Sequence, residues 1–400
     1  MTSKRKVAFI TTARSDYNTM YPLMKIAQEN ELIESYILAA GMHTVETFGN
    51  TWQELKKDNL QISHLVKFLN DSDDPAVFAK ELALGISKFT DVLEEIKPDL
   101  VCVSGDRIEN LSLFVSCTAL NIPIAHMCGG DITEGAIDNQ IRHVMTKLSH
   151  IHFVSMESHR LRVIQMGEEP WRVHITGDAA IDYIKNREKL SRQEIEKYLN
   201  INSNKNYFIS TFHPQTLGED NALDQYKNIL DNILTIEEIP VLIYPNIDPG
   251  FEPLKNLLIN FKRRRTDAII KKSFEKSIFY SLMNFASFMI GNSSSALWEA
   301  PSFELPAINV GIRQKGRVRG RNVIDVSGLD SQEIKNAIKK AKDPIFKKSL
   351  RGMKNPYGSG NASNKIIKIL ESIPINSQLL TKKFYDLDTT SLSNLITEKK

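Results

Sequence analysis

Acidic side chains follow two short apolar segments in the first half of the chain. Leu100–Ser104 and Ile122–Met127 have the length and composition of buried strands. Four carboxylates come soon after these strands: Asp106, Asp131, Glu134 and Asp138. Open parallel sheets bind ligands beyond the carboxyl ends of their strands, so we expect the four side chains to converge there. Crowded carboxylates raise one another's pKa, and two in different protonation states can act as general base and general acid.

Each of these acids also has a simpler interpretation. Asp106 can cap the helix predicted over Arg107–Leu120, and Asp138 can begin the helix predicted over Asn139–Leu148. Capping accounts for either residue alone, but it does not explain four acids at one sheet edge. The pattern therefore favours acid and base chemistry, with helix capping as the alternative.

A run of small residues in the second half is a candidate phosphate site. Ile290–Ser295 follows a predicted strand and opens a predicted helix, so the backbone N–H groups of Ser293 and Ser294 can surround a diphosphate. A serine-rich helix cap explains the same run equally well. Glu299, further along this helix, can accept both hydroxyls of a ribose, or it is an exposed helix acid.

Three other strand-end residues can meet a nucleotide. His213 leaves the first strand of the second half, and Pro214 stops that strand and holds the histidine; a structural role for His213 is the alternative. The loop 313–320, which begins with Arg313, is basic and punctuated by glycine, so it can close over phosphates or remain solvated. Arg14 follows the first predicted strand, where no GxGxxG motif occurs, and can meet a phosphate there.

Strands and helices alternate through both halves, which predicts an α/β protein with two Rossmann-like, doubly wound parallel sheets. The polar, asparagine-rich stretch Leu190–Asn206 marks the expected boundary. We therefore expect an N-terminal domain over residues 1–185, which carries the acids, and a C-terminal domain over 186–372. A polar tail covers 373–400 and is expected to fray from about Asn376, with residues 383–385 as its apolar anchor.

Composition narrows the classes of partner and compartment. The 400 residues are 42% hydrophobic and 25% charged, and 51 basic against 48 acidic residues leave a net charge of only +3, which gives no field that favours nucleic acid or anionic lipid. The three cysteines have no CxxC spacing, and His143, His150 and His152 have irregular spacing, so neither a disulfide framework nor a metal site is indicated. A reducing cytoplasm fits. No apolar run approaches about 18 residues, so no membrane span or export signal is expected.

Taken in order, the motifs resemble the signatures of the sugar-nucleotide 2-epimerases, and more closely the hydrolysing branch that feeds sialic-acid-type synthesis. The matching stretches extend over roughly residues 5 to 372 and are GlyAspArg (105–107), GlyGlyAsp…IleAspAsnGlnIleArgHis (129–143), HisPro (213–214), TyrProAsnIleAsp (244–248), GlyAsnSerSerSer (291–295) and ArgGlnLysGlyArg (313–317). An ordered set of this length is far more specific than any single motif.

The resemblance implies two Rossmann-like domains in the GT-B arrangement with the nucleotide between them, a homodimer, and a C-terminal helix that crosses back to the first domain. By position, it assigns the acid/base roles to Asp106 and Asp138, with Asp131 and Glu134 as further catalytic candidates. It also assigns the binding of UDP to a larger set: Arg14, Arg107, His213, Asn246, Ser293, Ser294, Glu299 and Arg313.

Some positions depart from the family pattern. Cys128 stands where the non-hydrolysing relatives have a glutamate, directly before the glycine pair, and Asp131 stands where many have glutamate. Relatives that act on UDP-N,N′-diacetylbacillosamine also lack the first of these glutamates. The resemblance therefore implies hydrolytic 2-epimerisation of UDP-GlcNAc to ManNAc and UDP, and the same reaction on UDP-N,N′-diacetylbacillosamine remains open.

The implied chemistry explains the need for both sites. The hydrogen on C2 of a nucleotide sugar has no neighbouring carbonyl, so a base can remove it only if the bond between C1 and UDP breaks almost together with it. Donors that stabilise the departing diphosphate are therefore half of the chemistry. Elimination to a 2-acetamidoglucal and its hydration require neither a metal nor a redox cofactor. A GT-B glycosyltransferase and a non-catalytic UDP-sugar-binding protein are the competing interpretations.

Overall fold

The computed structural model describes residues 4–47, 49–72, 74–134, 137–186, 189–202, 205–214, 222–245 and 251–388. Contacts divide the chain into two compact units. Unit 1 comprises Met1–Asp131, Asp138–Tyr183 and Tyr357–Lys400, and unit 2 comprises Ile132–Ile137 and Ile184–Pro356. Within the described ranges, no helix combines the length and the apolar content that crossing a bilayer requires.

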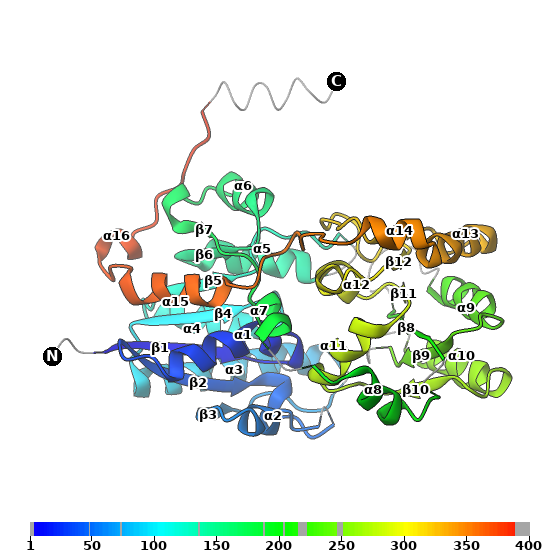
Figure 1. Ribbon diagram of the computed structural model, residues 1–400. Coiled ribbons are helices and arrows are strands. Elements are labelled where there is room, and N and C mark those ends of the chain that lie inside the picture. The colour runs from blue at the N-terminus through cyan, green and yellow to red at the C-terminus, as the bar shows by residue number, and fades with distance from the viewer. Residues whose placement is uncertain are drawn as a thin grey trace. The chain divides into compact units, whose positions relative to one another are not determined.

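Unit 1 is built on a parallel sheet of seven strands in the order β3-β2-β1-β4-β5-β6-β7 (Figure 1). The strands are β1 (Arg5–Thr11), β2 (Ile33–Ala40), β3 (Ile62–Val66), β4 (Leu100–Ser104), β5 (Ile124–Met127), β6 (Ile151–Val154) and β7 (Val173–Ile175). The order reverses between β1 and β4, and the crevice at such a reversal is where doubly wound sheets bind ligands.

Helices and short 3₁₀ turns connect these strands. They are α1 (Arg14–Gln28), η1 (Gly41–Thr44), α2 (Trp52–Lys57), α3 (Pro75–Ile96), η2 (Ile108–Asn110), α4 (Leu111–Ala119), α5 (Asp138–Leu148), α6 (Glu157–Gln165), η3 (Pro170–Arg172) and α7 (Ala179–Asn186). Local sequence sets their ends. In α3, the Asp74 side chain accepts a hydrogen bond from the Ala76 N–H at 2.7 Å, and Lys97 ends the helix in the left-handed conformation.

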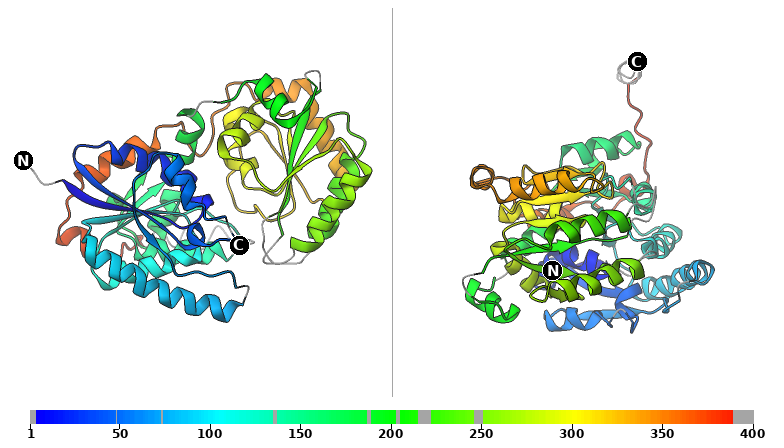
Figure 2. Two further views of the ribbon diagram at one scale, coloured as in Figure 1. Left: turned by 90° about the horizontal axis from the view of Figure 1, so that it is seen from below. Right: turned by 90° about the vertical axis from the view of Figure 1, so that its right-hand side faces the viewer.

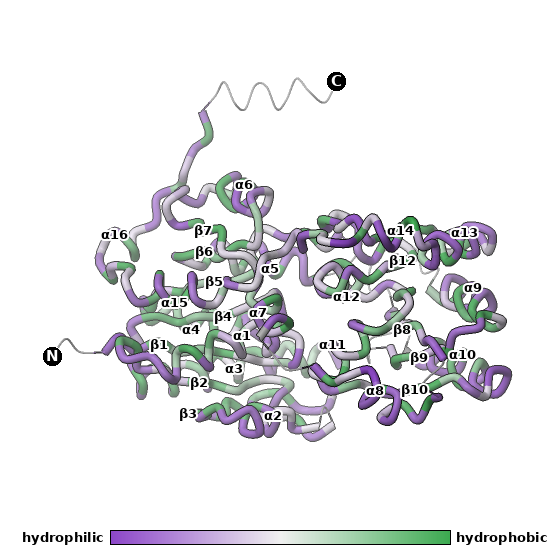
Figure 3. The backbone as a smooth tube through the Cα atoms, viewed as in Figure 1, coloured by the Kyte–Doolittle hydropathy of each residue, from purple (hydrophilic) through white to green (hydrophobic). Residues whose placement is uncertain are grey.

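The strands of unit 1 are apolar on both faces because helices cover both. On β1, Val7 and Phe9 belong to one buried cluster, and Ala8 and Ile10 belong to another on the opposite face. Strands buried in this way are continuous hydrophobic runs rather than alternating ones, as Figure 3 shows for the centre of the sheet. The burial pattern fixes the sheet, so the loops at its carboxyl edge are held on a rigid base.

Unit 2 repeats the plan with six parallel strands in the order β10-β9-β8-β11-β12-β13, and helices lie on both faces of its sheet (Figure 2). Its strands are β8 (Tyr207–Thr211), β9 (Ile239–Ile243), β10 (Ile269–Lys271), β11 (Met289–Gly291), β12 (Ala307–Val310) and β13 (Val323–Val326). Its helices and turns are α8 (Arg192–Leu199), α9 (Ala222–Ile233), α10 (Phe251–Arg264), α11 (Lys276–Phe285), α12 (Ser295–Trp298), η4 (Ala300–Phe303), α13 (Ser331–Lys342) and α14 (Pro344–Ser349).

The fold class predicted from the sequence is confirmed, since both sheets are doubly wound and reverse at the same place in their strand order. Four short helices were not expected: α7, α8 inside the polar stretch, α14 after Asp343, and α16 (Ser377–Leu380). The helix expected to begin at Ser295 is instead one turn of α-helix, α12, followed by η4. Pro301 lies inside the predicted helix, and a proline there interrupts the helical hydrogen bonds.

The C-terminal part of the chain is packed on unit 1. Helix α15 (Ala362–Ser372) lies against α1, and the short helix α16 (Ser377–Leu380) follows it. The buried guanidinium of Arg172 donates to the carbonyl oxygens of Gln378 and Leu379 at 2.9 and 2.8 Å. Lys382 reaches the buried carboxylate of Glu168 at 2.8 Å. The expectation that the tail frays from Asn376 is therefore wrong as far as residue 388, because buried ionic groups of unit 1 hold it.

Candidate active site

The turn after β4 presents Asp106. Gly105 in this turn has a φ of 93°, a value that favours glycine, and its carbonyl oxygen lies 2.8 Å from Nε2 of His126 on β5. Burial lowers the pKa of His126 to about 4, so the ring is neutral and Nε2 donates to this carbonyl. Nδ1 lies 3.4 Å from the Thr146 hydroxyl, which donates to the Arg142 carbonyl oxygen at 2.9 Å. A buried histidine thus fixes the backbone that carries Asp106.

A single arginine from α5 ties the two acidic loops together. The Arg142 side chain is 1% exposed and forms an ion pair with Asp106 through its NH2 nitrogen. Its NH1 nitrogen donates to the backbone oxygen of Asp131 at 2.9 Å. A buried guanidinium is costly without a charged partner, so it favours the ionised form of the Asp106 carboxylate.

Asp138 has the opposite environment. It is the first residue of α5, and burial, followed by the negative charge of Asp106, raises its pKa; Arg107 and Arg142 oppose this rise. One carboxylate is therefore paired with a cation while its neighbour is biased toward the protonated form. Two carboxyl groups whose surroundings favour different protonation states are suited to act as base and acid.

Asp131 is the third acid at this edge and follows the glycine pair. It is 2% exposed, and its Oδ1 atom lies 3.5 Å from Nε2 of His159. Gly130 has a φ of 76°, and a Cβ atom there would lie 2.4 Å from the His159 carbonyl oxygen. Only glycine allows this close approach, which packs the loop onto α6 and buries Asp131.

Arg107 belongs to the same group of charges. Its Nε atom donates to Oε1 of Glu109 at 2.6 Å, and its NH2 nitrogen lies 3.2 Å from the sulfur of Met42. Its charge also acts on Asp138. Glu109 was not among the predicted site residues; the signal in the sequence was a carboxylate two residues after the arginine, on the turn that leaves the strand.

Arg14 is the first residue of α1, is exposed and pairs with Glu54. The turn before it is shaped by Asp16, a buried carboxylate that was not among the predicted site residues. Asp16 accepts from the Thr11 hydroxyl at 2.7 Å and from the N–H groups of Thr12 and Ala13 at 2.9 and 3.0 Å. A short carboxylate directly after a strand end is a signal for such a turn.

Cys128, which departs from the family pattern, is at the end of β5 with a φ of 65°, an uncommon conformation for a residue with a side chain. Its sulfur lies 3.6 Å from the Ser104 hydroxyl and 3.9 Å from Oδ2 of Asp178. Burial raises the pKa of the thiol well above its usual range, so the group is neutral. Backbone strain of this kind is concentrated at functional sites.

The carboxyl edge of the unit 2 sheet is organised by Asn292. Its Oδ1 atom accepts from the His213 N–H at 2.7 Å, and its Nδ2 atom donates to the His213 carbonyl oxygen at 2.9 Å. Gly291 makes the approach possible, since a Cβ atom there would lie 1.9 Å from the Thr211 carbonyl oxygen. Burial, followed by the charge of Arg313, lowers the pKa of His213 to about 3, so its imidazole is neutral.

The basic loop 313–320 is tied to the same strand end. Arg313 and Gln314 both donate to the Asn292 carbonyl oxygen, at 3.3 and 2.8 Å. Arg317 donates to the side-chain oxygen of Gln314 at 3.0 Å. The solvated-loop alternative is therefore wrong for the first residues of this loop, because their side chains bind the protein's own backbone and one another.

The serine run lies beside this group. Ser293 is nearly buried, and its hydroxyl donates to that of Ser295 at 3.2 Å, while Ser294 precedes the single turn of α12. Glu299 is buried, and its Oε1 atom accepts from Lys276 Nζ at 3.0 Å and from the Tyr280 hydroxyl at 2.9 Å. The exposed-acid interpretation of Glu299 is wrong.

Two predicted site residues remain, Glu134 and Asn246. Glu134 belongs to unit 2, where its carboxylate pairs with Lys315 at 3.0 Å and stays 48% exposed. Asn246 lies outside the described residues. Unit 1 thus brings together Asp106, Asp131 and Asp138, and unit 2 brings together His213, Ser293 and Arg313.

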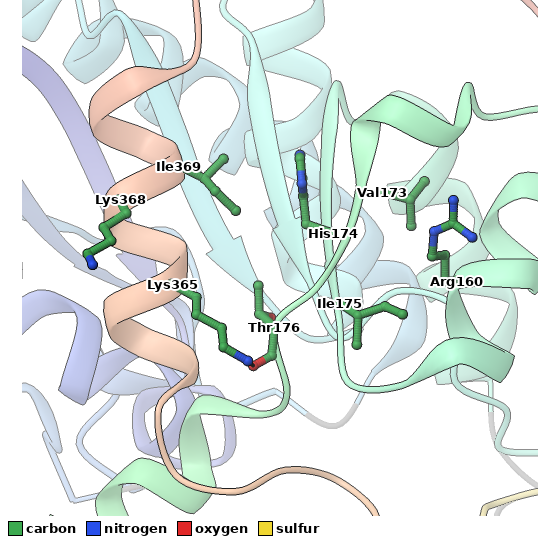
Figure 4. Close-up of a pocket in the computed structure, with 8 residues that line it drawn as sticks. All are labelled: Arg160, Val173, His174, Ile175, Thr176, Lys365, Lys368 and Ile369. Atoms are coloured by element: carbon green, nitrogen blue, oxygen red, sulfur yellow. Dashed lines mark hydrogen bonds between the residues drawn. The ribbon is translucent and has the colours of Figure 1, made fainter.

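A cavity of about 500 Å³ lies elsewhere on unit 1, along the free edge of β7 between α6 and α15 (Figure 4). Its charged lining residues are Arg160, Lys365 and Lys368, and it contains none of the predicted site residues. Over the described ranges, no three histidine, cysteine or acidic side chains are grouped as a metal site would require.

Comparisons with known proteins agree with this architecture. The family model described as UDP-N-acetylglucosamine 2-epimerase matches residues 25–371. A Campylobacter jejuni protein named GDP/UDP-N,N′-diacetylbacillosamine 2-epimerase (hydrolyzing) is 36% identical, over 96% of this chain and 100% of its own. A Legionella pneumophila UDP-N,N′-diacetylbacillosamine 2-epimerase (hydrolyzing) is 31% identical, over 94% and 98%. The crystal structure of a Neisseria meningitidis UDP-GlcNAc 2-epimerase bound to UDP-GlcNAc has the same fold, with a TM-score of 0.77 and 22% identity over 91% and 99%.

Proposed function

The chain belongs to the UDP-N-acetylglucosamine 2-epimerase family, and on that premise we propose that it is a hydrolysing 2-epimerase of a UDP-activated 2-acetamido sugar. The family resemblance found in the motifs is thereby confirmed. The observation that carries the proposed activity is the contrast between Asp106 and Asp138. One is paired with the buried Arg142, and the pKa of the other is raised by burial and by its neighbour's charge.

The proposed roles of the acids follow from this contrast. Asp106, ionised, takes the C2 proton while the bond between C1 and the UDP oxygen breaks, which leaves a C1=C2 double bond and UDP. Asp138, protonated, then delivers its proton to C2 from the opposite face as the oxygen of water adds to C1. Water loses a proton to Asp138, Asp106 releases its proton to solvent, and the sugar leaves as the free 2-epimer.

The departing diphosphate needs stabilisation that the acids cannot give. For this we assign Arg313, the neutral His213 and the amides of Ser293 and Ser294, since an uncharged imidazole can donate without placing a fixed charge in the site. Glu299, held by Lys276 and Tyr280, would accept the ribose hydroxyls. Arg14, Arg107 and Asn246 remain predicted UDP ligands by family position, and Asp131 and Glu134 remain predicted auxiliary acids.

Two sugars are candidates for the substrate. The family description refers to UDP-N-acetylglucosamine, whereas the relative with 36% identity is named for GDP/UDP-N,N′-diacetylbacillosamine and the compared relative with 31% identity for UDP-N,N′-diacetylbacillosamine. The 36% identity favours the second sugar, because relatives named for either sugar reach 31%. The two sugars differ at C4 and C6, positions that do not take part in the reaction. Both sugars share the C1–C2 chemistry on which the proposed roles of Asp106 and Asp138 depend.

The test is incubation with each UDP-sugar alone in D₂O, followed by NMR of the sugar. Free 2-epimer with deuterium at C2, together with UDP, is the expected product, and the faster of the two parallel reactions identifies the substrate. A glycosyltransferase would leave both UDP-sugars intact without an acceptor. A non-catalytic binding protein would broaden or shift the substrate signals while the C2 hydrogen stayed unexchanged. Either result refutes the proposal.

We also propose a homodimer, as the family resemblance implies. Light scattering on the purified protein across a concentration series is the measurement. A mass near 45 kDa, that of one chain, at every concentration contradicts it.

A further inference from the structure

Glu109 is a buried carboxylate that the proposed reaction leaves without a role. It lies in η2, between the turn that carries Asp106 and the start of α4, and its side chain is 0% exposed. Oε1 accepts from Nε of Arg107 at 2.6 Å, whereas Oε2 has no hydrogen-bond partner among the described residues. An ionised group so fully buried is retained at a cost, which suggests that its charge has a use.

We propose that Glu109 is a positioning residue of the reaction: it anchors the guanidinium of Arg107 and offsets its positive charge, so that Asp138 retains the proton it must deliver to C2. The inference rests on the proposed function, because it assigns Asp138 the part of the acid. It concerns a residue that touches neither the sugar nor UDP and acts through Arg107.

The geometry supports an anchoring role. Arg107 is held at two points, by Glu109 at Nε and by the Met42 sulfur at 3.2 Å from NH2, while 30% of its side chain remains exposed. An arginine fixed at its Nε end presents the rest of its planar guanidinium in one orientation. Glu109 is itself packed, since a Cβ atom at Gly41 would lie 3.4 Å from its Cγ.

The charges that act on Asp138 and on Arg107 define what Glu109 changes. Burial and Asp106 raise the pKa of Asp138, and Arg107 and Arg142 lower it. Glu109, Asp138 and Asp16 in turn raise the pKa of Arg107. The nearby His43, whose pKa burial lowers to about 4, adds no charge at neutral pH. Loss of the Glu109 charge would leave Arg107 opposed by Asp16 and Arg142 opposed by Asp106 and Asp131, and the proton on Asp138 would be held less tightly.

The first test is Glu109→Gln, which keeps the size of the side chain and an oxygen that can accept from Arg107. We expect the alkaline limb of the kcat/KM pH profile to move to lower pH by about one unit. A pKa change of this order is expected when one charge is removed near a titrating group in a partly buried site. The carboxyl carbon of Asp138, followed by NMR in protein carrying ¹³C-labelled aspartate and assigned by its loss in Asp138→Asn, should shift its titration in the same direction.

The matched control is Glu169→Gln. Glu169 also pairs with the Nε of a buried arginine, Arg172, at 2.9 Å, but Arg172 holds the C-terminal segment rather than the acids. This variant should leave the titration of Asp138 and the pH profile unchanged. If the ion pair of Glu109 were merely structural, Glu109→Gln would lower the melting temperature but would leave the titration of Asp138 and the pH profile unchanged.

The opposite substitution keeps the proposal testable if Glu109→Gln fails to fold. Arg107→Gln removes the cation and should raise the pH at which Asp138 titrates, and adding Glu109→Gln to it should remove much of that rise. The inference is overturned if the titration of Asp138 is the same in Glu109→Gln and the parent protein, or if Arg107→Gln moves it downward. If the parent protein shows no turnover, the proposed function fails, while the NMR titrations still decide the effect of Glu109 on Asp138.

Discussion

The carboxyl edges of the two sheets have the same topology and opposite chemistry. In unit 1, the ends of β4 and β5 lead to Asp106 and Asp131, which share the buried cation Arg142. In unit 2, the ends of β8 and β11 lead to the neutral pair His213 and Asn292, next to a basic loop. One backbone plan therefore supports a set of acids in one case and a set of hydrogen-bond donors in the other.

The difference shows how each edge handles charge. Unit 1 buries an ionic network, in which the removal of one partner changes the protonation of the others. At the ends of β8 and β11, unit 2 keeps the buried His213 and Asn292 neutral and leaves the positive charge on the loop, which suits an anion that must bind and leave. The comparison predicts that substitutions in unit 1 alter proton transfer, whereas substitutions in unit 2 alter affinity for a diphosphate.

The largest expected effect is that of Asp138→Asn, which removes the proposed acid but neither partner of the Arg142 ion pair. Turnover should fall by about 10²–10⁴-fold, the usual contribution of a general acid, while the melting temperature changes little. Initial rates of UDP release measure it. Asp91→Asn, the same chemical change on the exposed face of α3, is the control. Unaltered turnover in Asp138→Asn would remove this residue from the mechanism.

Asp106→Asn, unlike Asp138→Asn, should also lower the stability of the protein. It leaves the guanidinium of Arg142 buried without its carboxylate partner, so the free energy of unfolding should fall by roughly 2–3 kcal/mol, below the usual cost for a fully buried pair because Asp106 is partly exposed. Denaturant unfolding of both variants gives the comparison. Equal stability of the two would show that Arg142 does not depend on Asp106.

In unit 2, Arg313→Gln tests the donor set. We expect the Kd for UDP to rise by about 10- to 100-fold, since one charge-assisted contact to a phosphate is worth roughly 1.5–3 kcal/mol, while the pH profile of turnover keeps its shape. Calorimetric titration with UDP is the measurement, with Arg351→Gln, at an exposed position of the same unit, as the control. A shifted pH profile with unchanged affinity for UDP would contradict the assignment of diphosphate binding to unit 2 and of proton transfer to unit 1.

The smallest effect concerns stability against pH, and both units should share it. Burial lowers the pKa of His126 to about 4 and that of His213 to about 3, from an ordinary value of 6.5. The unfolded chain therefore takes up protons first, and stability should fall as the pH drops below 6.5 toward 4. Melting temperatures across this range measure the slope. His126→Gln should flatten it, although it also loosens the Asp106 turn; a slope unchanged by this variant contradicts the assignment.

Local sequence predicted most of the helices and strands. Helix α8 was not predicted, although its sequence contains a helix-start signal. Helix α8 begins with a capping box in which Glu194 Oε2 accepts from the Ser191 N–H at 2.8 Å, yet its polar composition led to the prediction of a linker. The strands were easier to predict, since their continuous apolar runs are typical of parallel sheets covered on both faces.

The candidate site could be predicted in part. Residue types at the strand ends identified Asp106, Asp131 and Asp138, which the structure gathers at one edge, but the same reasoning grouped Glu134 with them although its partner is Lys315 in unit 2. Spacing along the chain does not reveal which side of a loop a residue faces. Glu109 was not predicted because a carboxylate near the start of a helix is common in protein sequences. Only its burial distinguishes it.

The sequence by itself determined the two doubly wound sheets, the family and the kinds of residue at each sheet edge, because these depend on hydrophobic periodicity and on short motifs that are local in the chain. Only the tertiary structure decided which charges meet. Arg142 pairs with Asp106, which is 36 residues away, and Asn292 with His213, which is 79 residues away. Such contacts depend on strand order and burial, and it is burial that separates the protonation of Asp138 from that of its neighbour.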